Sequence, residues 1–582
     1  HEWAATTKTG DRDELVPGVT EQAWRQVAVT DRECVGAQRC PFGDKCFAEL
    51  ARAEAGRADV VVTNHALLAI DALENHIVLP DHDVVIIDEA HDLVDRVTSV
   101  AAAELSAAAV ETAARRCGRM IEEKLVTRLR EAGEDLAQAL AAVPAGRLDI
   151  LDESLAAPLA AVREAAGNCV GELRRIARST EDEPAQVAAQ RAAVAATGEA
   201  RDAAERILGS FEASLADRAE VVWMDRPAAA DPAREAARPP TLRVAPLQIG
   251  SLLAEKLFGE RTVTLTSATL ALGGSFEPLA RQWGLPVAGS PAPRAPAAAG
   301  RAGQRGRNGR GEPDAERGAG GQEGPDGPDG PDGPEEPAVG REQHGPDRDA
   351  EPHPLTWSGM DVGSPFDHPR SGILYCAKHL PPPGRDGLDS SYLEELRELI
   401  AAAGGRTLGL FSSMRAARQA ADELRESIGY PLLCQGDDQT SQLVSQFAAD
   451  EPTCLFGTLS LWQGVDVPGR SLQLVVIDRI PFPRPDDPLA SARQRAVAAR
   501  GGNGFMEVAA AQAALLLAQG TGRLLRTMSD RGVVAILDPR LVTKRYGGFL
   551  RTSLPPFWAT TDPQVVRGAL RRLAAPADQS TS

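Results

Sequence analysis

The sequence predicts an α/β protein with two parallel-sheet domains. Residues 84–87 read Val-Val-Ile-Ile, an apolar β-branched run typical of a buried parallel strand, and Asp88 and Glu89 follow it directly. Over residues 354–582, short apolar runs alternate with helical patterns, which is the pattern of a parallel sheet covered by helices.

The elements of both domains follow from these runs. We expect the first domain at residues 59–100 and 219–286, with strands near 60–63 and 84–88 and strand-like runs resuming at 221–224. We expect the second domain at residues 354–582, with strands near 372–375, 406–411, 453–456, 474–477 and 533–537. A helical pattern over 414–428 follows the second of those strands.

Two further segments differ in composition. Residues 101–210 contain no Phe, Trp or Tyr, and their apolar residues recur at intervals of three and four, so we predict a helical insertion over 101–218. Residues 287–353 are rich in Pro and Gly and repeat Gly-Pro-Asp between 324 and 334. We predict that this linker is disordered, and a passive insertion is favoured over a tail that binds a partner.

The carboxylates after the first strand point to nucleotide chemistry. Carboxyl ends of parallel strands face the crevice where open α/β sheets bind ligands. There one acid, Asp88, is able to hold Mg²⁺ on a nucleotide, and the next, Glu89, to orient the attacking water. The alternative is a core strand followed by a solvated acidic turn.

Four later segments occur in a fixed order. They are 264–270 (Thr-Leu-Thr-Ser-Ala-Thr-Leu), 405–413 (Gly-Arg-Thr-Leu-Gly-Leu-Phe-Ser-Ser), 457–469 (Gly-Thr-Leu-Ser-Leu-Trp-Gln-Gly-Val-Asp-Val-Pro-Gly) and 519–526 (Gln-Gly-Thr-Gly-Arg-Leu-Leu-Arg). With Asp-Glu-Ala-His at 88–91, they resemble motifs II to VI of superfamily 2 helicases, within the iron–sulfur DinG/XPD-like group. The resemblance covers the chain outside the linker.

This resemblance implies two RecA-like motor domains, the end of an iron–sulfur module at 1–58, and an arch of helices at 101–218. It implies ATP and Mg²⁺ as cofactors, with Asp88 near the metal and Glu89 polarising the attacking water. His91 relays the nucleotide state to Ser267 and Thr269.

The second motor domain contributes the other nucleotide residues that the resemblance implies. Arg523 and Arg526 act as arginine fingers, and their spacing of three predicts that both lie on one helix face. Gln519, Gly464 and Asp466 sense the nucleotide and close the cleft. The alternatives are a solvated helix end for the arginines and a turn acid before proline for Asp466.

DNA is the partner that the resemblance implies: single-stranded DNA tracked in the 5′→3′ direction and duplex junctions parted by the arch, in DNA repair or replication. Ser412, Ser413 and Thr458 are the predicted phosphate contacts. Trp462 is favoured as a core aromatic over a base-stacking residue. His65, which follows Asn64, either shapes the strand end or is a structural histidine.

Three evenly spaced cysteines form the candidate metal site. Cys34, Cys40 and Cys46 are separated by five residues each. A 4Fe–4S cluster takes four thiolates, and in the resembling group the first ligand lies upstream of such a trio. We therefore expect the cluster to be absent or labile in this chain. Zinc with His65 is the second choice, and Cys117 and Cys169 are predicted to be core residues.

A phosphate-binding loop does not occur in this sequence. Such a loop reads Gly-x-x-x-x-Gly-Lys-Ser/Thr, whereas of the six lysines only Lys8 precedes a Ser or Thr, and no glycine lies before it. The chain also begins with His1. We expect a helicase truncated before its P-loop and inactive by itself; the rival is a natural paralogue that has lost its ATP site.

Composition limits the partners and the cellular compartment that we expect for this protein. The net charge of −19 argues against a generally basic coat, although a local groove decides DNA contact. We expect no membrane span, because no uncharged apolar run is long enough. Eight cysteines in 582 residues predict a reducing cytoplasm, where the protein acts as a nucleoid-associated monomer.

Two other function classes remain. A non-catalytic DNA-binding or scaffold protein predicts DNA affinity that ATP does not change. An RNA-directed helicase of the DEAH type is the third candidate, but the cysteine trio and Gly-Val-Asp-Val-Pro-Gly at 464–469 argue against it.

Overall fold

The computed structural model describes most of the chain. The described residues are 42–73, 78–118, 120–177, 184–226, 239–287, 355–384, 387–458, 461 and 471–575, together with 3, 6–15, 19, 21–24, 27–29, 34, 36–37 and 40. The chain divides into two units, His1–Ala292 with Leu355–Ser582, and Pro293–Pro354. The second unit, and with it almost all of the predicted linker, lies outside the described residues.

The N-terminal part carries the first strand of the predicted motor. Its elements are η1 (Arg12–Glu14), α2 (Glu21–Trp24), η2 (Gly43–Lys45), α3 (Phe47–Ala55), α4 (His65–Leu73), β1 (Val84–Ile87), η3 (Ala90–Asp92) and α5 (Leu93–Ala101). β1 pairs in parallel with β6 (Thr262–Leu265), with Val84 opposite Thr262 and Ile87 opposite Leu265. The strand predicted near residues 84–88, before the carboxylates, is therefore confirmed.

The strand predicted at residues 60–63 is wrong. In the structure, Val60 and Val62 are exposed and the segment joins no sheet of the described residues. A β-branched run forms a strand only where a neighbouring strand takes its backbone hydrogen bonds. Here the chain instead turns into α4, whose first residue is His65.

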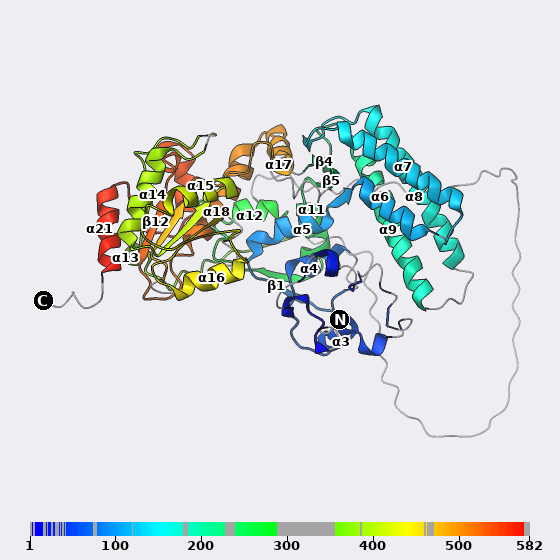
Figure 1. Ribbon diagram of the computed structural model, residues 1–582, viewed down its shortest axis with the longest axis horizontal. Helices are drawn as coiled ribbons and strands as arrows, with labels where there is room; N and C mark the ends of the chain where they lie inside the picture. Colours follow the sequence, from blue (N-terminus) through cyan, green and yellow to red (C-terminus); the bar gives the residue numbers. More distant parts are fainter. Residues whose placement is uncertain are drawn as a thin grey trace, which may run out of the picture. The chain divides into compact units, whose positions relative to one another are not determined.

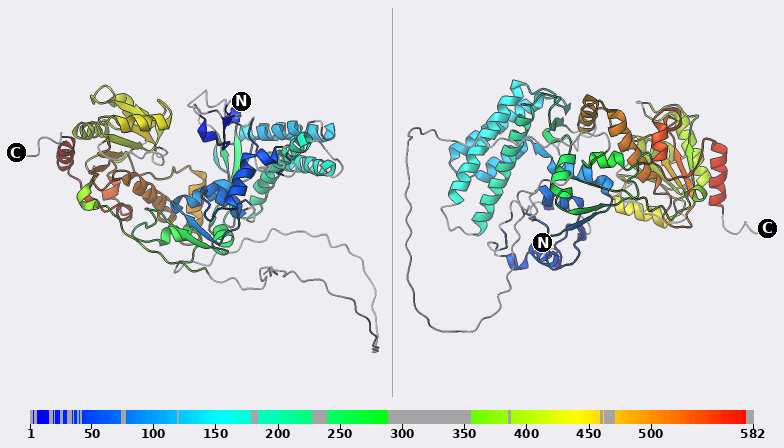
Figure 2. Two further views of the ribbon diagram at one scale, coloured as in Figure 1. Left: turned by 90° about the horizontal axis from the view of Figure 1, so that it is seen from below. Right: turned by 180° about the vertical axis from the view of Figure 1, so that it is seen from behind.

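The predicted insertion is a bundle of long helices on a small sheet. It comprises β2 (Ala103–Leu105), α6 (Ala107–Cys117), α7 (Glu123–Ala142), β3 (Gly146–Arg147), α8 (Glu153–Ala177), α9 (Pro184–Ser210), β4 (Glu220–Asp225) and β5 (Thr241–Pro246). Helices α6 to α9 lie side by side in all views (Figures 1 and 2). Cys117 and Cys169 are fully buried in their core, as predicted.

The boundary predicted at residue 219 differs from the structure. The strand-like run at 221–224, which forms β4, was expected to belong to the first motor domain, but β4 and β5 pair antiparallel with each other and with β3 and β2, in the order β2-β5-β4-β3. Strand-like sequence predicts a strand and not its partner, because pairing depends on which strand lies beside it. The chain returns to the first motor through α11 (Gly250–Leu253), η4 (Ala254–Phe258), β6 and α12 (Glu277–Gln282).

The second motor domain is a doubly covered parallel sheet. Its elements are α13 (His368–Ser371), β7 (Gly372–Cys376), α14 (Ser390–Ala403), β8 (Thr407–Phe411), α15 (Met414–Leu424), β9 (Leu432–Cys434), α16 (Thr440–Ala449), β10 (Cys454–Thr458), β11 (Leu474–Ile477), α17 (Pro488–Ala499), η7 (Phe505–Ala510), α18 (Ala511–Thr521), β12 (Gly532–Ile536), α19 (Arg540–Thr543), α20 (Gly547–Thr552), β13 (Trp558–Thr560) and α21 (Pro563–Ala574). All pairings in the described sheet, ordered β13-β7-β12-β11-β8-β10-β9, are parallel. The five predicted strands are confirmed.

Alternation along the central strands explains why helices cover both faces. In β11, Val475 and Ile477 join one hydrophobic cluster, while Leu474 and Val476 join the other. Successive side chains of a strand point to opposite faces, so an uninterrupted apolar strand needs a cover on each face. Figure 1 shows α14 and α15 beside the strands of this sheet.

Hydrogen bonds join the two predicted motor domains. Arg493 of α17 donates to Thr98 Oγ1 at 2.9 Å and to the Leu247 carbonyl at 3.1 Å. The Gly273 amide, after β6, donates to Ser553 Oγ at 2.7 Å, beside α20. Within the described part of the chain, no helix has the length and apolar character needed to span a membrane.

Candidate functional site

The carboxylate of Asp88 is fixed at the end of β1 by its neighbours. Its Oδ1 accepts the Glu89 amide at 2.9 Å and the Thr266 hydroxyl at 2.9 Å. Thr266 follows β6, and its amide continues the strand pairing by donating to the Ile87 carbonyl at 2.8 Å. The parallel register of β1 and β6 therefore brings the two strand ends to one place. Oδ2 of Asp88 receives no hydrogen bond from a described residue.

Glu89 has a strained backbone at this point. Its φ of 48° and ψ of 43° lie in the left-handed region, where a residue with a side chain is uncommon. Such strain persists only where surrounding contacts over-determine the backbone, and it is concentrated at functional sites. The side chain of Glu89 is 60% exposed. The local geometry therefore presents a carboxylate to solvent at the strand end.

His91 connects this carboxylate to the segment after β6. Its Nδ1 lies 2.8 Å from Ser267 Oγ and 3.2 Å from Thr269 Oγ1. Ser267 Oγ in turn donates to Glu89 Oε2 at 2.7 Å. His91 therefore contacts both residues to which it was predicted to relay the nucleotide state, and the relay itself stays a prediction.

A residue of the second motor domain completes the network. The amide Nε2 of Gln519, near the end of α18, donates to Nε2 of His91. Since an amide nitrogen only donates, that ring nitrogen accepts and the imidazole carries its proton on Nδ1. Donation then runs in one direction, from Gln519 through His91 and Ser267 to Glu89.

Burial keeps the imidazole in the neutral form that this chain of bonds requires. The His91 side chain is only 5% exposed. Its pKa is lowered by burial above all, against the opposing charges of Asp92 and Glu89. A doubly protonated ring would have no acceptor for the Gln519 amide. The contact between the two motor domains therefore depends on a neutral His91.

His65 holds the other side of the same strand end. Its Nε2 donates to the backbone carbonyl of Asp88 at 2.8 Å. Asn64 places the histidine by accepting the Leu67 amide at 2.8 Å at the start of α4. Of the two roles considered for His65, the observed contact is the one at the strand end.

The predicted arginine fingers do not share a helix face. Helix α18 ends at Thr521, and Arg523 and Arg526 follow in the turn after it. Asp530 organises this turn by accepting the Arg526 amide at 2.7 Å. The spacing argument was wrong because Gly522 ends the helix before either arginine. Arg526 is exposed and Arg523 is half-buried.

The predicted DNA-contacting hydroxyls are engaged within the protein. Ser412 donates through its Oγ to Asp478 at 2.9 Å, and its amide bonds the same carboxylate at 2.9 Å. Ser413 caps α15 by accepting an amide of its first turn at 3.2 Å. Thr458 donates to Gln435 Oε1 at 3.0 Å. No observation here tests their contact with DNA, which stays a prediction.

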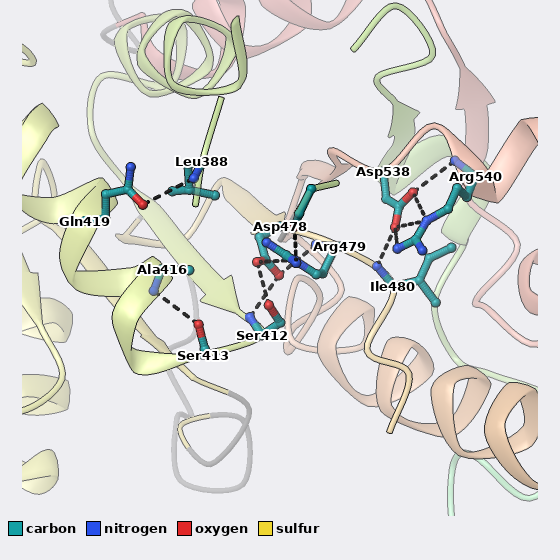
Figure 3. A network of polar contacts seen from close by, with 11 residues as sticks. Leu388, Ser412, Ser413, Ala416, Gln419, Asp478, Arg479, Ile480, Asp538 and Arg540 are labelled. Atoms are coloured by element: carbon teal, nitrogen blue, oxygen red, sulfur yellow. Dashed lines mark hydrogen bonds and ion pairs between the residues drawn. The ribbon is translucent and has the colours of Figure 1, made fainter. Parts of the chain in front are cut away.

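Two buried acids follow neighbouring strands of the second sheet, and the sequence analysis missed both. Asp478 follows β11 and pairs with Arg479 at 3.2 Å, while Asp538 follows β12 and pairs with Arg540 at 2.6 Å (Figure 3). Asp538 also accepts the Ile480 amide at 3.0 Å. The signal was available, since an acid ends each apolar run as Asp88 does after β1.

Two of the predicted site residues, Gly464 and Asp466, lie outside the described residues, as does Trp462, which was predicted to be a core aromatic. Thr266 was also missed, although it stands beside the predicted Ser267 in the sequence. A threonine directly after a strand that pairs with the carboxylate-bearing strand was the signal for it.

Candidate metal ligands occur among the described side chains. Among them, no group of three or more His, Cys, Asp or Glu is arranged to hold a metal ion. Asp88 nevertheless fits Mg²⁺, because this ion is held in nucleotide sites by one or two carboxylates together with phosphates and waters. Cys34, Cys40 and Cys46 are half-buried but are not gathered into such a group. Their arrangement does not fit a cluster, and the cluster stays a prediction.

Comparisons with known proteins identify relatives of this chain. Residues 396–557 match the Helicase C-terminal domain family. The chain is 52% identical over 573 residues to the ATP-dependent helicase DinG of Mycobacterium tuberculosis (strain ATCC 25177 / H37Ra), covering 98% of this chain and 75% of that relative. It is 28% identical to the ATP-dependent DNA helicase YoaA of Escherichia coli (strain K12), covering 99% of this chain and 79% of that protein. A solved structure titled "XPD_APO" aligns with a TM-score of 0.48 and 15% identity, over 91% of this chain and 86% of that one.

The fold and site define a two-domain α/β protein with a polar network that joins a carboxylate pair on one domain to a glutamine on the other. Within that class, the identity over nearly the whole chain is decisive. The chain belongs to the DinG family of ATP-dependent helicases.

Proposed function

We propose that this chain forms the motor of an ATP-dependent DNA helicase that translocates on single-stranded DNA and unwinds duplex junctions. The observation that carries the proposal is the directed set of hydrogen bonds from Gln519 to Glu89 through His91 and Ser267. It joins the second motor domain to the carboxylate pair of the first. Family membership supports ATP as the nucleotide.

Each residue of the site has a different role in ATP hydrolysis. Asp88 would hold Mg²⁺ on the nucleotide, and the ion would neutralise charge on the phosphates. Glu89 orients and polarises the attacking water through Oε1, which receives no hydrogen bond from a described residue. Ser267 holds Oε2 at 2.7 Å and so fixes the carboxylate. Arg523 and Arg526, from the turn after α18, supply positive charge to the transition state.

His91 links hydrolysis to movement of the domains. When the cleft is closed, Gln519 donates to the imidazole, and the remaining bonds to Ser267 and Glu89 are aligned. Opening the cleft removes that donor and frees the ring. The geometry at Glu89 thus responds to the position of the second motor domain, which is the coupling that directional movement, 5′→3′ in this proposal, requires.

The P-loop sets a condition on activity. The 582 residues contain no Gly-x-x-x-x-Gly-Lys-Ser/Thr, and hydrolysis by such motors uses the amides and lysine of that loop to hold the phosphates. We therefore expect the 582 residues by themselves to bind DNA without hydrolysing ATP. The proposed substrate places the protein with the bacterial chromosome, as a monomer acting in repair or replication.

The test uses the product of the complete gene, whatever its length. Glu89→Gln keeps an acceptor for Ser267 but removes the base, so we expect kcat for DNA-stimulated ATP hydrolysis to fall by at least about a hundredfold. ATP binding and single-strand binding are expected to remain. Glu255→Gln, at a carboxylate 58% exposed in the same domain, is the matched control. Full DNA-stimulated turnover in Glu89→Gln would remove Glu89 from this role.

A second candidate is a non-catalytic DNA-binding scaffold. The two candidates differ in how ATP acts. A scaffold binds single-stranded DNA with the same affinity with and without ATP, even as the complete gene product, whereas a motor changes its DNA affinity with the nucleotide state.

A further inference from the structure

Three aromatic side chains meet on the second motor domain outside the site described above. Phe482 follows β11, Phe505 begins η7, and Tyr546 precedes α20. Their ring centroids are 5.4 Å apart for Phe482 and Phe505, 5.4 Å for Phe482 and Tyr546, and 5.3 Å for Phe505 and Tyr546. We call Phe482, Phe505 and Tyr546 the aromatic triad. Phe505 is 38% exposed, so the triad is not closed off from solvent.

The backbone that presents Phe505 is unusual. Residues Phe505–Ala510 form a π-helix, as do Ala254–Phe258, and this rare turn is frequently found at functional sites. Gly504 precedes it, and a Cβ at that position would lie 2.2 Å from the Gln494 carbonyl oxygen of α17. Only glycine permits this approach, which places the start of the π-helix against α17. Phe505 is therefore held at a defined position instead of on a loose loop.

Basic residues border the triad. The guanidinium carbon of Arg540 lies 5.8 Å from the Phe482 ring centroid, and Asp538 neutralises its charge. Lys544 and Arg545, directly before Tyr546, are exposed, and neither forms an ion pair within the described part of the chain. Two uncompensated positive charges next to partly exposed rings match a ligand that has both aromatic faces and negative charge.

The surroundings of the triad contrast with the rest of the chain. Aromatic residues make up only 4% of the sequence, and the net charge is −19, so three rings beside two unpaired cations are a local departure on both counts. The acid nearest in sequence to Phe505 on the same π-helix, Glu507, faces Arg281 at 3.8 Å. Arg281, in the first motor domain, therefore partly compensates the charge of Glu507.

We propose that the aromatic triad is a stacking platform for a base of single-stranded DNA, with Phe505 as the stacking ring and Lys544 and Arg545 contacting the adjoining phosphates. The inference rests on the proposed DNA-binding function and adds a base contact to it. Every base has an aromatic face, so stacking of this kind holds a strand without reading its sequence. Duplex DNA offers no such face along its length, so the platform selects single strands.

The experiment measures binding by the 582-residue chain, with no ATP required. Fluorescence anisotropy compares a short oligothymidylate with an abasic oligonucleotide of the same length and charge, and with the corresponding duplex. The variants are Phe505→Ala, Phe505→Leu, Phe505→Trp, and Lys544→Gln with Arg545→Gln. Trp558→Ala, at a ring 49% exposed on β13, is the matched control.

Phe505→Ala and Phe505→Leu are expected to weaken oligothymidylate binding by about tenfold and to leave abasic binding unchanged. Phe505→Trp is expected to bind oligothymidylate as tightly as the wild type, and Trp558→Ala is expected to have no effect on binding. The double charge variant weakens both strands equally and reduces the salt dependence of binding. Phe505→Leu keeps an apolar side chain in place, so it separates lost stacking from lost packing.

Three results would overturn the platform. They are equal losses on the base-bearing and abasic strands, wild-type affinity in Phe505→Ala, and duplex bound as tightly as the single strand. If the wild-type chain binds no single-stranded DNA, the proposed function fails together with the platform. If the wild type binds and Phe505→Ala binds equally well, only the platform fails.

Discussion

Replacement of Asp478 by asparagine should change how the stability of the second motor domain depends on pH. Asp478 ends β11 with a side chain that is 2% exposed. It accepts hydrogen bonds from the Ser412 amide and hydroxyl and pairs with Arg479. Burial nevertheless dominates and raises the pKa of its carboxyl to about 6, against the attraction of Arg479 and the hydrogen bonds.

The size and sign of the effect follow from this pKa. In the unfolded chain the carboxyl has its ordinary value of 3.8, and in the folded protein about 6. Between these values the folded protein holds a proton that the unfolded chain has released, so stability falls as pH rises through the window. The difference corresponds to about 3 kcal/mol. Asparagine has no such proton, so Asp478→Asn gains up to this amount relative to wild type between about pH 4 and about pH 7.

Hydrogen exchange followed by mass spectrometry is the assay. Peptides that cover β8 and β11 are compared between Asp478→Asn and wild type at each pH, because intrinsic exchange rates then cancel. Protection in the variant should rise relative to wild type across the window. Asp562→Asn, at the N-terminus of α21, reports the same substitution at an exposed carboxylate.

The reasoning would be refuted by a stability difference that stays constant with pH. A difference that shifts in favour of wild type as pH rises would refute it more strongly, since it would mean that Arg479 and the two Ser412 bonds outweigh the loss of hydration. A constant difference would mean that these interactions just offset the cost of burying the carboxylate, and the second result would make Asp478 and Arg479 a favourable ion pair.

Two further predictions concern His65 and Arg567. In the complete gene product, His65→Leu should lower kcat with little change in KM for ATP, because the Asp88 carbonyl loses its donor. His65→Gln, whose Nε2 reaches the same carbonyl, should retain activity. Equal losses of kcat in both variants, or a matching fall in thermal midpoint, would make His65 merely structural. Arg567→Met should destabilise the fold by about 3 kcal/mol, measured by urea unfolding, since Glu395 is 3% exposed and would keep a buried charge. Adding Glu395→Gln to this variant should recover most of the lost stability. No recovery in the double variant would contradict the charge explanation.

Local pattern was enough to predict five strands of the second motor domain (β7, β8, β10, β11 and β12), but not the edge strands β9 and β13. Each central strand is an uninterrupted apolar run, and the residues that end it are polar, so its existence and limits depend on neighbours in sequence. The helices of the insertion followed for the same reason, from apolar residues at intervals of three and four. Residues 60–63 show the limit of this reasoning, because an apolar β-branched run without a partner strand stays unpaired.

The arginine turn shows a second limit. Spacing by three implies one helix face only if the helix continues, and Gly522 with the Asp530 side chain decides that it does not. The antiparallel pairing of β4 and β5 with β2 and β3 is a third case. In each, the residue types were visible in the sequence, but the partner was not.

The sequence by itself predicted which residues carry the chemistry: Asp88, Glu89 and His91 after one strand, Ser267 and Thr269 after another, and Gln519 far along the chain. Only the tertiary structure decided that Gln519 donates to His91 across 428 residues, that His65 and Thr266 hold Asp88 from two sides, and that three distant rings meet. The physical reason is that residue type and short-range periodicity act within a few residues. Donor, acceptor and ring contacts depend instead on the packing that brings distant strand ends and turns together.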